Sequence, residues 1–134
     1  MKMTTLHTII QEACRKVLVP DERILAVYLL GSAARDQLRR ESDIDIGIML
    51  EYGSRMSAVE VTEIAGALSA VLERDTDIGL ISSANLVYAC EALFKGIPLF
   101  YRDEDRAKLM RANLLGMYLQ FNRDRSEVLN AYRA

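Results

Sequence analysis

The apolar run Ile24–Leu30 constrains the fold of this chain more than any other feature. Seven apolar residues follow one another without a polar position, and Gly31 ends the run. This length and continuity are typical of a strand covered on both faces. Such a strand needs helices packed on each side of a sheet, so the run predicts a small α/β or α+β domain.

Patterns along the rest of the chain predict further helices and strands that suit such a sheet. Apolar residues at helical spacing between Leu6 and Val17 predict a first helix that ends near Pro20. The later elements are expected as a strand at 43–50, a helix behind the capping box Ser57–Glu60, a strand at 77–81, a helix capped by Ser82 or Ser83 that runs through Phe94 and stops at Lys95-Gly96, a strand at 97–101, and a long helix at about 103–132 capped by Asp103. No repeat or linker interrupts this order, so residues 1–134 are interpreted as a single domain.

Composition and charge exclude several classes of protein. Among 134 residues, 51% are hydrophobic, and 17 basic against 19 acidic side chains give a net charge of −2. A chain of this kind can fill a core, and its balance argues against direct binding of nucleic acid through bulk charge. The two cysteines, Cys14 and Cys90, lie among apolar residues, as free thiols do. Because no signal peptide or membrane-spanning run is evident, we expect a cytoplasmic protein without a membrane partner.

Two aspartates at the start of the second expected strand form a candidate metal site. Asp43 and Asp45 flank Ile44, and residues two apart on a strand share one face with Cα atoms about 6.5 Å apart. Their carboxylates can converge on Mg²⁺, which prefers oxygen ligands. The alternative is that they only solvate the strand end or pair with Arg39 and Arg40.

Gly31 and Ser32 follow the first expected strand and open a short predicted helical turn. A glycine, free backbone N–H groups and a hydroxyl at a helix N-terminus make a site suited to a phosphate. A plain turn with Ser32 as its N-cap is the alternative interpretation.

The whole stretch GSAARDQLRRESDIDI resembles the signature of the minimal nucleotidyltransferases, a branch of the superfamily with the DNA polymerase β-like catalytic fold. The matching positions are Gly31, Ser32, Ala34, Arg35, Arg39, Ser42, Asp43, Ile44 and Asp45. Asp36 stands where the family often has glycine. The resemblance implies a polymerase-β-like domain, with a mixed sheet flanked by helices.

The resemblance also implies a set of catalytic and substrate-binding residues. Asp43 and Asp45 would bridge two Mg²⁺ ions, and a third carboxylate is expected on a later strand. Asp77 is preferred for this role because it opens the apolar run of the third strand, although Asp75 competes with it. Nucleotide binding is expected from Gly31, Ser32, Arg35, Arg39 and Ser42. The two arginines are equally consistent with ion pairs to Glu41 or Asp36.

Family members transfer a nucleoside monophosphate from a nucleoside triphosphate to a hydroxyl and release pyrophosphate. The small members resemble antitoxins that transfer AMP from ATP to a tyrosine of a HEPN-domain ribonuclease toxin, and this is the activity and partner that we expect. Two alternatives stay open: a non-catalytic antitoxin of the same fold, and a nucleotidyltransferase acting on a small molecule or RNA. The sequence leaves homo-oligomer formation and base preference undecided.

The expected terminal helix has apolar residues on more than one side between Leu109 and Phe121. Such a helix needs a second surface to bury against. Packing between two layers of its own domain is an equally good interpretation. The tyrosines Tyr28, Tyr88, Tyr118 and Tyr132 are expected to be core or rim aromatic residues rather than platforms for a nucleotide base.

Overall fold

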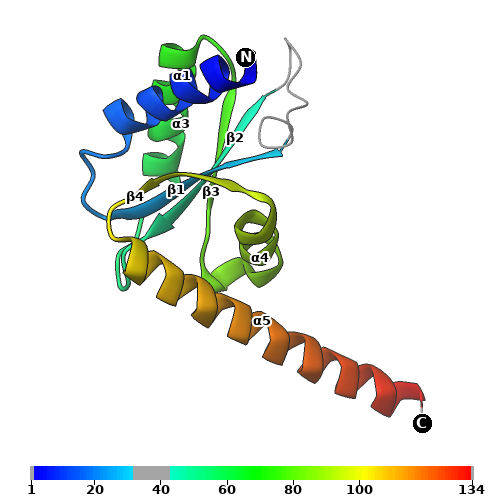
Figure 1. The fold of residues 1–134 in the computed structure, drawn as a ribbon. Coiled ribbons are helices and arrows are strands. Elements are labelled where there is room, and N and C mark those ends of the chain that lie inside the picture. Colours follow the sequence, from blue (N-terminus) through cyan, green and yellow to red (C-terminus); the bar gives the residue numbers. More distant parts are fainter. Residues whose placement is uncertain (1, 32–42, 134) are drawn as a thin grey trace.

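The computed structural model describes residues 2–31 and 43–133 of the chain. Its elements, in order, are α1 (Lys2–Val17), β1 (Ile24–Leu30), β2 (Ile44–Leu50), α3 (Ala58–Leu72), β3 (Thr76–Leu80), the 3₁₀ turn η1 (Ser83–Asn85), α4 (Leu86–Lys95), β4 (Ile97–Tyr101) and α5 (Glu104–Arg133). The four strands form one sheet in the order β3-β2-β1-β4, with helices on both faces (Figure 1). Strand β1 runs antiparallel to β2 and β4, whereas β2 and β3 are parallel. The predicted fold class, a mixed sheet flanked by helices, is therefore confirmed.

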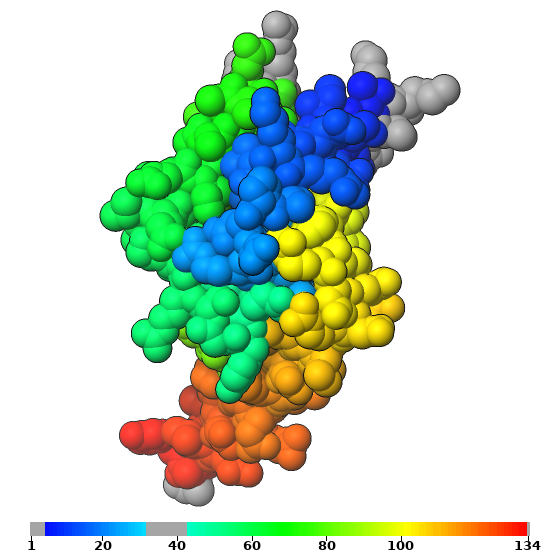
Figure 2. Space-filling model, turned by 90° about the vertical axis from the view of Figure 1, so that its left-hand side faces the viewer, coloured from blue at the N-terminus to red at the C-terminus, as the bar shows by residue number. Residues whose placement is uncertain are grey.

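Each face of the sheet contributes to its own apolar core. On one face, α1 and α3 lie side by side (Figure 2), and they cover Val27, Leu29 and the three isoleucines of β2. On the other face, α4 and the first part of α5 cover Leu25, Tyr28 and Met49. Strand β1 is buried by both cores, as its uninterrupted apolar sequence predicts.

Both cysteines are free and buried, as their apolar surroundings predict. Burial raises the pKa of the Cys14 thiol to about 12. The Sγ atom of Cys90 lies 3.9 Å from the carbonyl oxygen of Leu114, where α4 meets α5.

Polar caps fix the helix ends, and one predicted cap is wrong. The Ser57–Glu60 capping box is present at the start of α3, and Asp103 accepts a hydrogen bond of 3.1 Å from the Arg106 backbone N–H at the start of α5. Ser82, however, caps only the turn η1. Helix α4 begins later, because the Asn85 side chain accepts the hydrogen bond from the Tyr88 backbone N–H.

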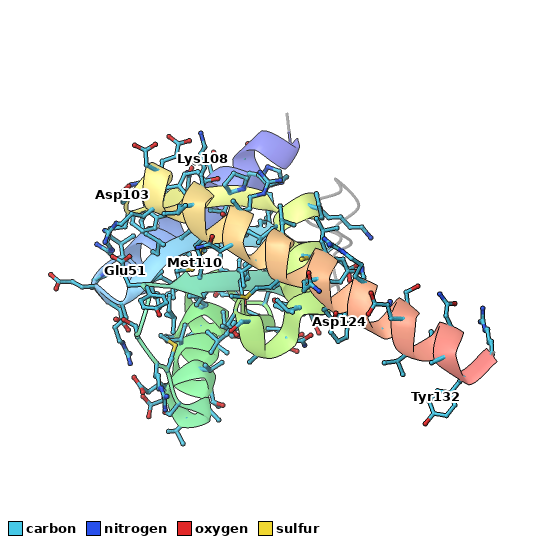
Figure 3. The ribbon with its side chains drawn as sticks, turned by 90° about the horizontal axis from the view of Figure 1, so that it is seen from below. Glu51, Asp103, Lys108, Met110, Asp124 and Tyr132 are labelled. Carbon is cyan, nitrogen blue, oxygen red and sulfur yellow. The ribbon has the colours of Figure 1, made fainter. Side chains whose placement is uncertain are left out.

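Helix α5 extends beyond the body of the protein, which consists of the sheet and the helices packed on its two faces. Its first part is buried on α4 and β1 through Ala107 and Leu114. Its second part runs past α4 and away from the sheet, with Tyr132 far from the body (Figures 1 and 3). The interpretation that this helix packs between two layers of its own domain is therefore wrong for its second half, because the described chain supplies no second layer there. Within the described residues, no helix has the length and apolar character that crossing a membrane requires.

Candidate active site

Asp45 and Asp77 lie directly opposite each other on the parallel strands β2 and β3. Residues paired in this way point to the same face of a sheet. Here it is the face covered by α4, since the isoleucines that alternate with Asp45 belong to the core under α1 and α3. The pairing of β2 with β3 thus places Asp77, the preferred third carboxylate, beside Asp45. The competing residue Asp75 precedes β3, and its backbone carbonyl accepts a hydrogen bond from the Ile44 backbone N–H.

The carboxylate of Asp45 lies near two other carboxylates at this edge of the sheet. Asp43 directly precedes β2 and is exposed, whereas Asp45 is half-buried. Burial, together with the negative charges of Asp77 and Asp43, raises the pKa of Asp45. The folded chain therefore keeps a partly buried carboxylate beside two like charges, an arrangement that costs stability and is typical of functional sites.

Gly31 directly follows β1 and lies next to the Asp45 side chain. It has φ +65°, and a Cβ atom at this position would collide with the Oδ2 atom of Asp45. Only glycine adopts this backbone conformation freely and also leaves room for the carboxylate. The neighbouring predicted nucleotide-binding residues Ser32, Arg35, Arg39 and Ser42 lie outside the described residues.

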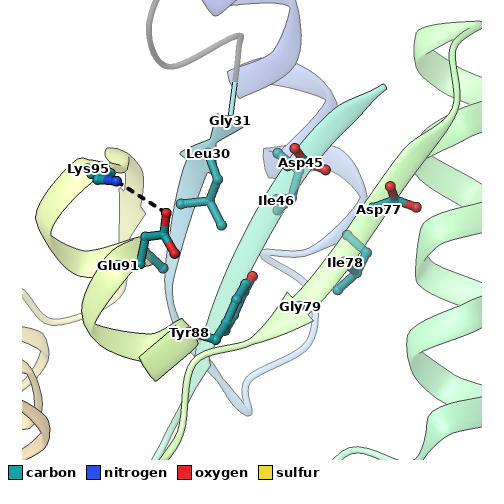
Figure 4. Close-up of a pocket in the computed structure, with 11 residues that line it drawn as sticks. Leu30, Gly31, Asp45, Ile46, Asp77, Ile78, Gly79, Tyr88, Glu91 and Lys95 are labelled. Carbon is teal, nitrogen blue, oxygen red and sulfur yellow. Dashed lines mark hydrogen bonds and ion pairs between the residues drawn. The ribbon is translucent and has the colours of Figure 1, made fainter. Parts of the chain in front are cut away.

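A pocket of about 410 Å³ adjoins the carboxylates. Asp45, Asp77 and the ends of β1, β2 and β3 form one side, and α4 forms the other (Figure 4). The lining combines apolar side chains on the α4 side of the sheet, such as Leu30 and Ala92, with the acidic pair at the rim. A concave site of this size, apolar with a few convergent polar groups, is typical of small-molecule binding.

Gly79 on β3 makes room for a tyrosine in this pocket. Gly47 and Gly79 pair across the two strands, and the Tyr88 hydroxyl group occupies the space that a Cβ atom of Gly79 would need. Burial and the charge of Asp45 raise the pKa of Tyr88. This tyrosine, expected only as a core or rim residue, therefore lines the candidate site.

Helix α4 also contributes a pair of charged residues that the sequence analysis missed. Glu91 and Lys95 line the pocket, and the Lys95 Nζ atom lies 3.2 Å from the Glu91 Oε1 atom. The available signal was their helical spacing from Tyr88, since residues three to four apart share a helix face. Among the described lining residues, Lys95 is the only one with a positive charge.

The chemistry of the donor set suits a hard cation, although the described residues hold no ready-made cluster. Within residues 2–31 and 43–133, no three acidic, histidine or cysteine side chains are close enough to hold a metal ion. Asp45 and Asp77 nevertheless offer carboxylate oxygens from adjacent strands at the pocket rim. Mg²⁺ commonly takes only one or two protein carboxylates and completes its shell with water and substrate phosphates. The residues present therefore fit such an ion.

Comparison with known proteins agrees with this geometry. The model of the family described as "Polymerase beta, Nucleotidyltransferase" matches residues 12–105. A curated relative, "Protein adenylyltransferase MntA" of Shewanella oneidensis, is 24% identical over 108 residues, which cover 81% of this chain and 76% of the relative.

Solved structures share the fold. One described as "the toxin-antitoxin with AMP-PNP" has a TM-score of 0.77 at 23% identity, covering 92% of this chain and 98% of that chain. Another, of a tri-AMPylated Shewanella oneidensis HEPN toxin in complex with its MNT antitoxin, has a TM-score of 0.74 at 21% identity, covering 96% and 99%. The predicted polymerase-β-like fold is thereby confirmed.

Proposed function

This chain belongs to the polymerase beta nucleotidyltransferase family, and we propose that it transfers AMP from ATP to a tyrosine hydroxyl of a HEPN toxin, for which it acts as the antitoxin. One observation carries the proposal: Gly31, Asp45 and Asp77 meet at the rim of a pocket large enough for a nucleotide. This is the arrangement that phosphoryl chemistry requires, with acidic groups beside a backbone that a phosphate can approach.

The proposed reaction is an in-line displacement at the α-phosphorus of ATP. The acceptor oxygen forms a bond to that phosphorus, the bond to the oxygen that bridges the α- and β-phosphates breaks, and pyrophosphate leaves. Asp77 accepts the proton of the acceptor hydroxyl, since it is the carboxylate on the more exposed strand β3. Gly31, with Ser32 after it in the sequence, would hold the β- and γ-phosphates.

Asp43, Asp45 and Asp77 would hold two Mg²⁺ ions. When bound, the ions supply charge neutralisation at the attacking and leaving oxygens. The raised pKa of Asp45 supports this assignment, since a cation there would relieve the repulsion that Asp77 and Asp43 exert on Asp45.

Support for a protein acceptor comes from the relatives. The curated relative is called a protein adenylyltransferase, and one of the similar structures holds a tri-AMPylated HEPN toxin. Another was determined with AMP-PNP, an ATP analogue. These names favour a HEPN toxin over a small molecule or RNA as the acceptor of this chain.

The test is transfer of label from α-³²P-ATP, with and without Mg²⁺, to the product of the neighbouring gene, which the proposal expects to be a HEPN protein. We expect label on a tyrosine of that protein, lost in Asp45→Ala and Asp77→Ala and retained in the matched control Asp75→Ala. Failure of all four nucleoside triphosphates, with a tight complex still formed, would favour the non-catalytic antitoxin. Label found only on RNA or on a small molecule would contradict the proposal that the acceptor is a protein.

A further inference from the structure

The second half of α5 carries an apolar stripe that the described chain leaves uncovered. Residues three, four or seven apart make one stripe along this helix: Ala107, Met110, Leu114, Tyr118, Phe121, Val128 and Tyr132. Ala107 and Leu114 are buried against the body, but Phe121, Val128 and Tyr132 are 42%, 56% and 87% exposed. The stripe thus stays apolar where it passes from the core to the surface. Its second half is suited to being covered by another molecule.

Helix α4 carries a second exposed apolar group, next to the pocket. Cys90 contacts α5, whereas Tyr88 and Lys95 line the pocket. At about 100° per residue, Val87 and Phe94 fall between these two sides of α4, and both side chains are exposed. They occupy the strip of α4 that leads from α5 to the pocket rim.

The two groups have the composition of an interface core. Arg111 lies over the Phe94 ring at 5.9 Å from its centroid, and Arg125 lies over the Phe121 ring at 5.5 Å. Exposed Met117 is next to this stripe. Aromatic residues, methionine and arginine are the types enriched where protein interfaces are most buried.

We propose that this α4–α5 surface, composed of Val87, Phe94, Met117, Phe121, Val128 and Tyr132, docks the protein that receives the AMP. The inference rests on the proposed function, because a protein acceptor must be held where its hydroxyl reaches the pocket. A partner seated between the outer face of α4 and the second half of α5 meets the pocket rim at Glu91 and Lys95. Its matching face is apolar and bordered by carboxylates, which Arg111 and Arg125 contact.

A second copy of this chain fits the surface less well. Pairing of two α5 helices would cover the stripe on α5, but it would leave Val87 and Phe94 of α4 exposed beside the pocket. A single acceptor protein accounts for both groups.

The test uses calorimetry to compare how three variants of the full chain bind the HEPN protein identified as the AMP acceptor. Phe121→Ser/Val128→Ser alters the α5 stripe, Phe94→Ser alters the α4 group, and Leu119→Ser is the matched control. Leu119 is also exposed, at 60%, but helical spacing places it away from the stripe. We expect the first two variants to raise the Kd about tenfold or more and the control to leave it unchanged. Affinity for AMP-PNP and helical circular dichroism stay at wild-type levels in all three.

Unchanged binding in both surface variants, or an equal loss in Leu119→Ser, would overturn the inference. It would also be overturned if light scattering showed a wild-type dimer that Phe121→Ser/Val128→Ser converts to a monomer with HEPN binding intact. A failure of the proposed function gives a different result. The wild-type protein would then bind the HEPN protein through this surface but transfer no label, and it would be an antitoxin that acts by binding alone.

Discussion

At the scale of one residue, the position of the Asp45 carboxylate costs stability, and the proposed metal site would explain why the chain keeps it. The carboxylate is half-buried, faces Asp77 on the next strand and carries a raised pKa because of burial and its acidic neighbours. A chain selected only to fold would not place a charge there, since burying a charge without a cation costs free energy.

Asp45→Asn should therefore stabilise the ligand-free protein while abolishing transfer. After allowance for solvent screening of this half-exposed group, we expect a gain of at most about 1 kcal/mol in the free energy of unfolding, equivalent to a rise in Tm of at most about 4 °C for a domain of this size. Thermal unfolding at neutral pH in EDTA measures the gain, and Asp43→Asn is the control, with a smaller gain because Asp43 is exposed. A lower Tm for Asp45→Asn would show that this carboxylate makes contacts that stabilise the fold.

Gly79→Ala should destabilise the protein through Tyr88. The new Cβ atom would collide with the Tyr88 hydroxyl and ring, and overpacking of this kind costs about 1–3 kcal/mol. Urea unfolding of Gly79→Ala, Tyr88→Ala and the double variant measures the coupling. We expect the cost of Gly79→Ala to be much smaller in the Tyr88→Ala background. Additive effects would mean that the glycine is required for another reason.

Lys95→Met should weaken nucleotide binding by removing the positive charge that α4 brings to the pocket. For an exposed charge that interacts with phosphate, we expect the KM for ATP to rise about fivefold or less, with little change in kcat. Glu91→Gln, which frees Lys95 from its ion pair, is the opposing control and should not raise the KM. An unchanged KM in Lys95→Met would place the triphosphate elsewhere.

At the scale of helices and strands, local patterns predicted most of the fold. The apolar run Ile24–Leu30 and the capping box at Ser57 have the same bounds in the structure as in the sequence analysis. The start of α4 was harder to predict, because Ser82, Ser83 and Asn85 are all good caps and only packing selects among them.

The candidate site was predictable where it is local in sequence and not where it depends on packing. Asp43 and Asp45 are two residues apart, and their shared face follows from strand geometry. The contribution of α4 to the pocket depends on how that helix crosses the sheet. Tyr88 lies over Gly79 only because β3 and α4 pack against each other, a contact that no short motif encodes.

One contact between elements should make stability depend on pH. Arg23 joins Asp21, before β1, to Glu60 in the first turn of α3. Hydrogen bonds from Arg23 lower the pKa of Asp21. A lowered pKa in the folded state contributes stability above the unfolded pKa, near 4, and this contribution is lost as the pH falls through the folded value.

Asp21→Asn should therefore be less stable than the wild type at pH 7, by up to about 1 kcal/mol after allowance for solvent screening. Below about pH 3 the difference should shrink toward zero, because the wild-type carboxyl is then protonated as well. Urea unfolding from pH 2.5 to 7 measures it, with Asp124→Asn on the exposed part of α5 as the control. A difference that is constant across this range would contradict the assignment to the ionised pair.

At the scale of the whole molecule, the body that forms the pocket is separate from the extension that we propose for docking. The two apolar cores draw on the sheet, α1, α3, α4 and the first part of α5, and Leu114 is the last residue of α5 in them. The exposed side chains beyond Tyr118 contribute little to either core. The first part of α5 thus belongs to the folded body, and the docking proposal concerns only its second part together with the outer face of α4.

A chain ending at Gln120 should consequently fold almost as stably as the full chain. We expect its Tm to lie within about 3 °C of the full-length value, because stability follows the buried apolar area and the removed side chains are largely exposed. Its affinity for AMP-PNP should be unchanged, since none of the described pocket residues is removed. Scanning calorimetry and titration calorimetry measure the two quantities.

The informative comparison is with a chain ending at Ala112, which removes Leu114 from the core beneath α4. Loss of that buried side chain should cost at least about 2–5 kcal/mol, and the transition should shift well below that of the Gln120 variant. If the Gln120 variant melted as early as the Ala112 variant, the second half of α5 would be part of the folding unit. The division between body and extension would then be wrong.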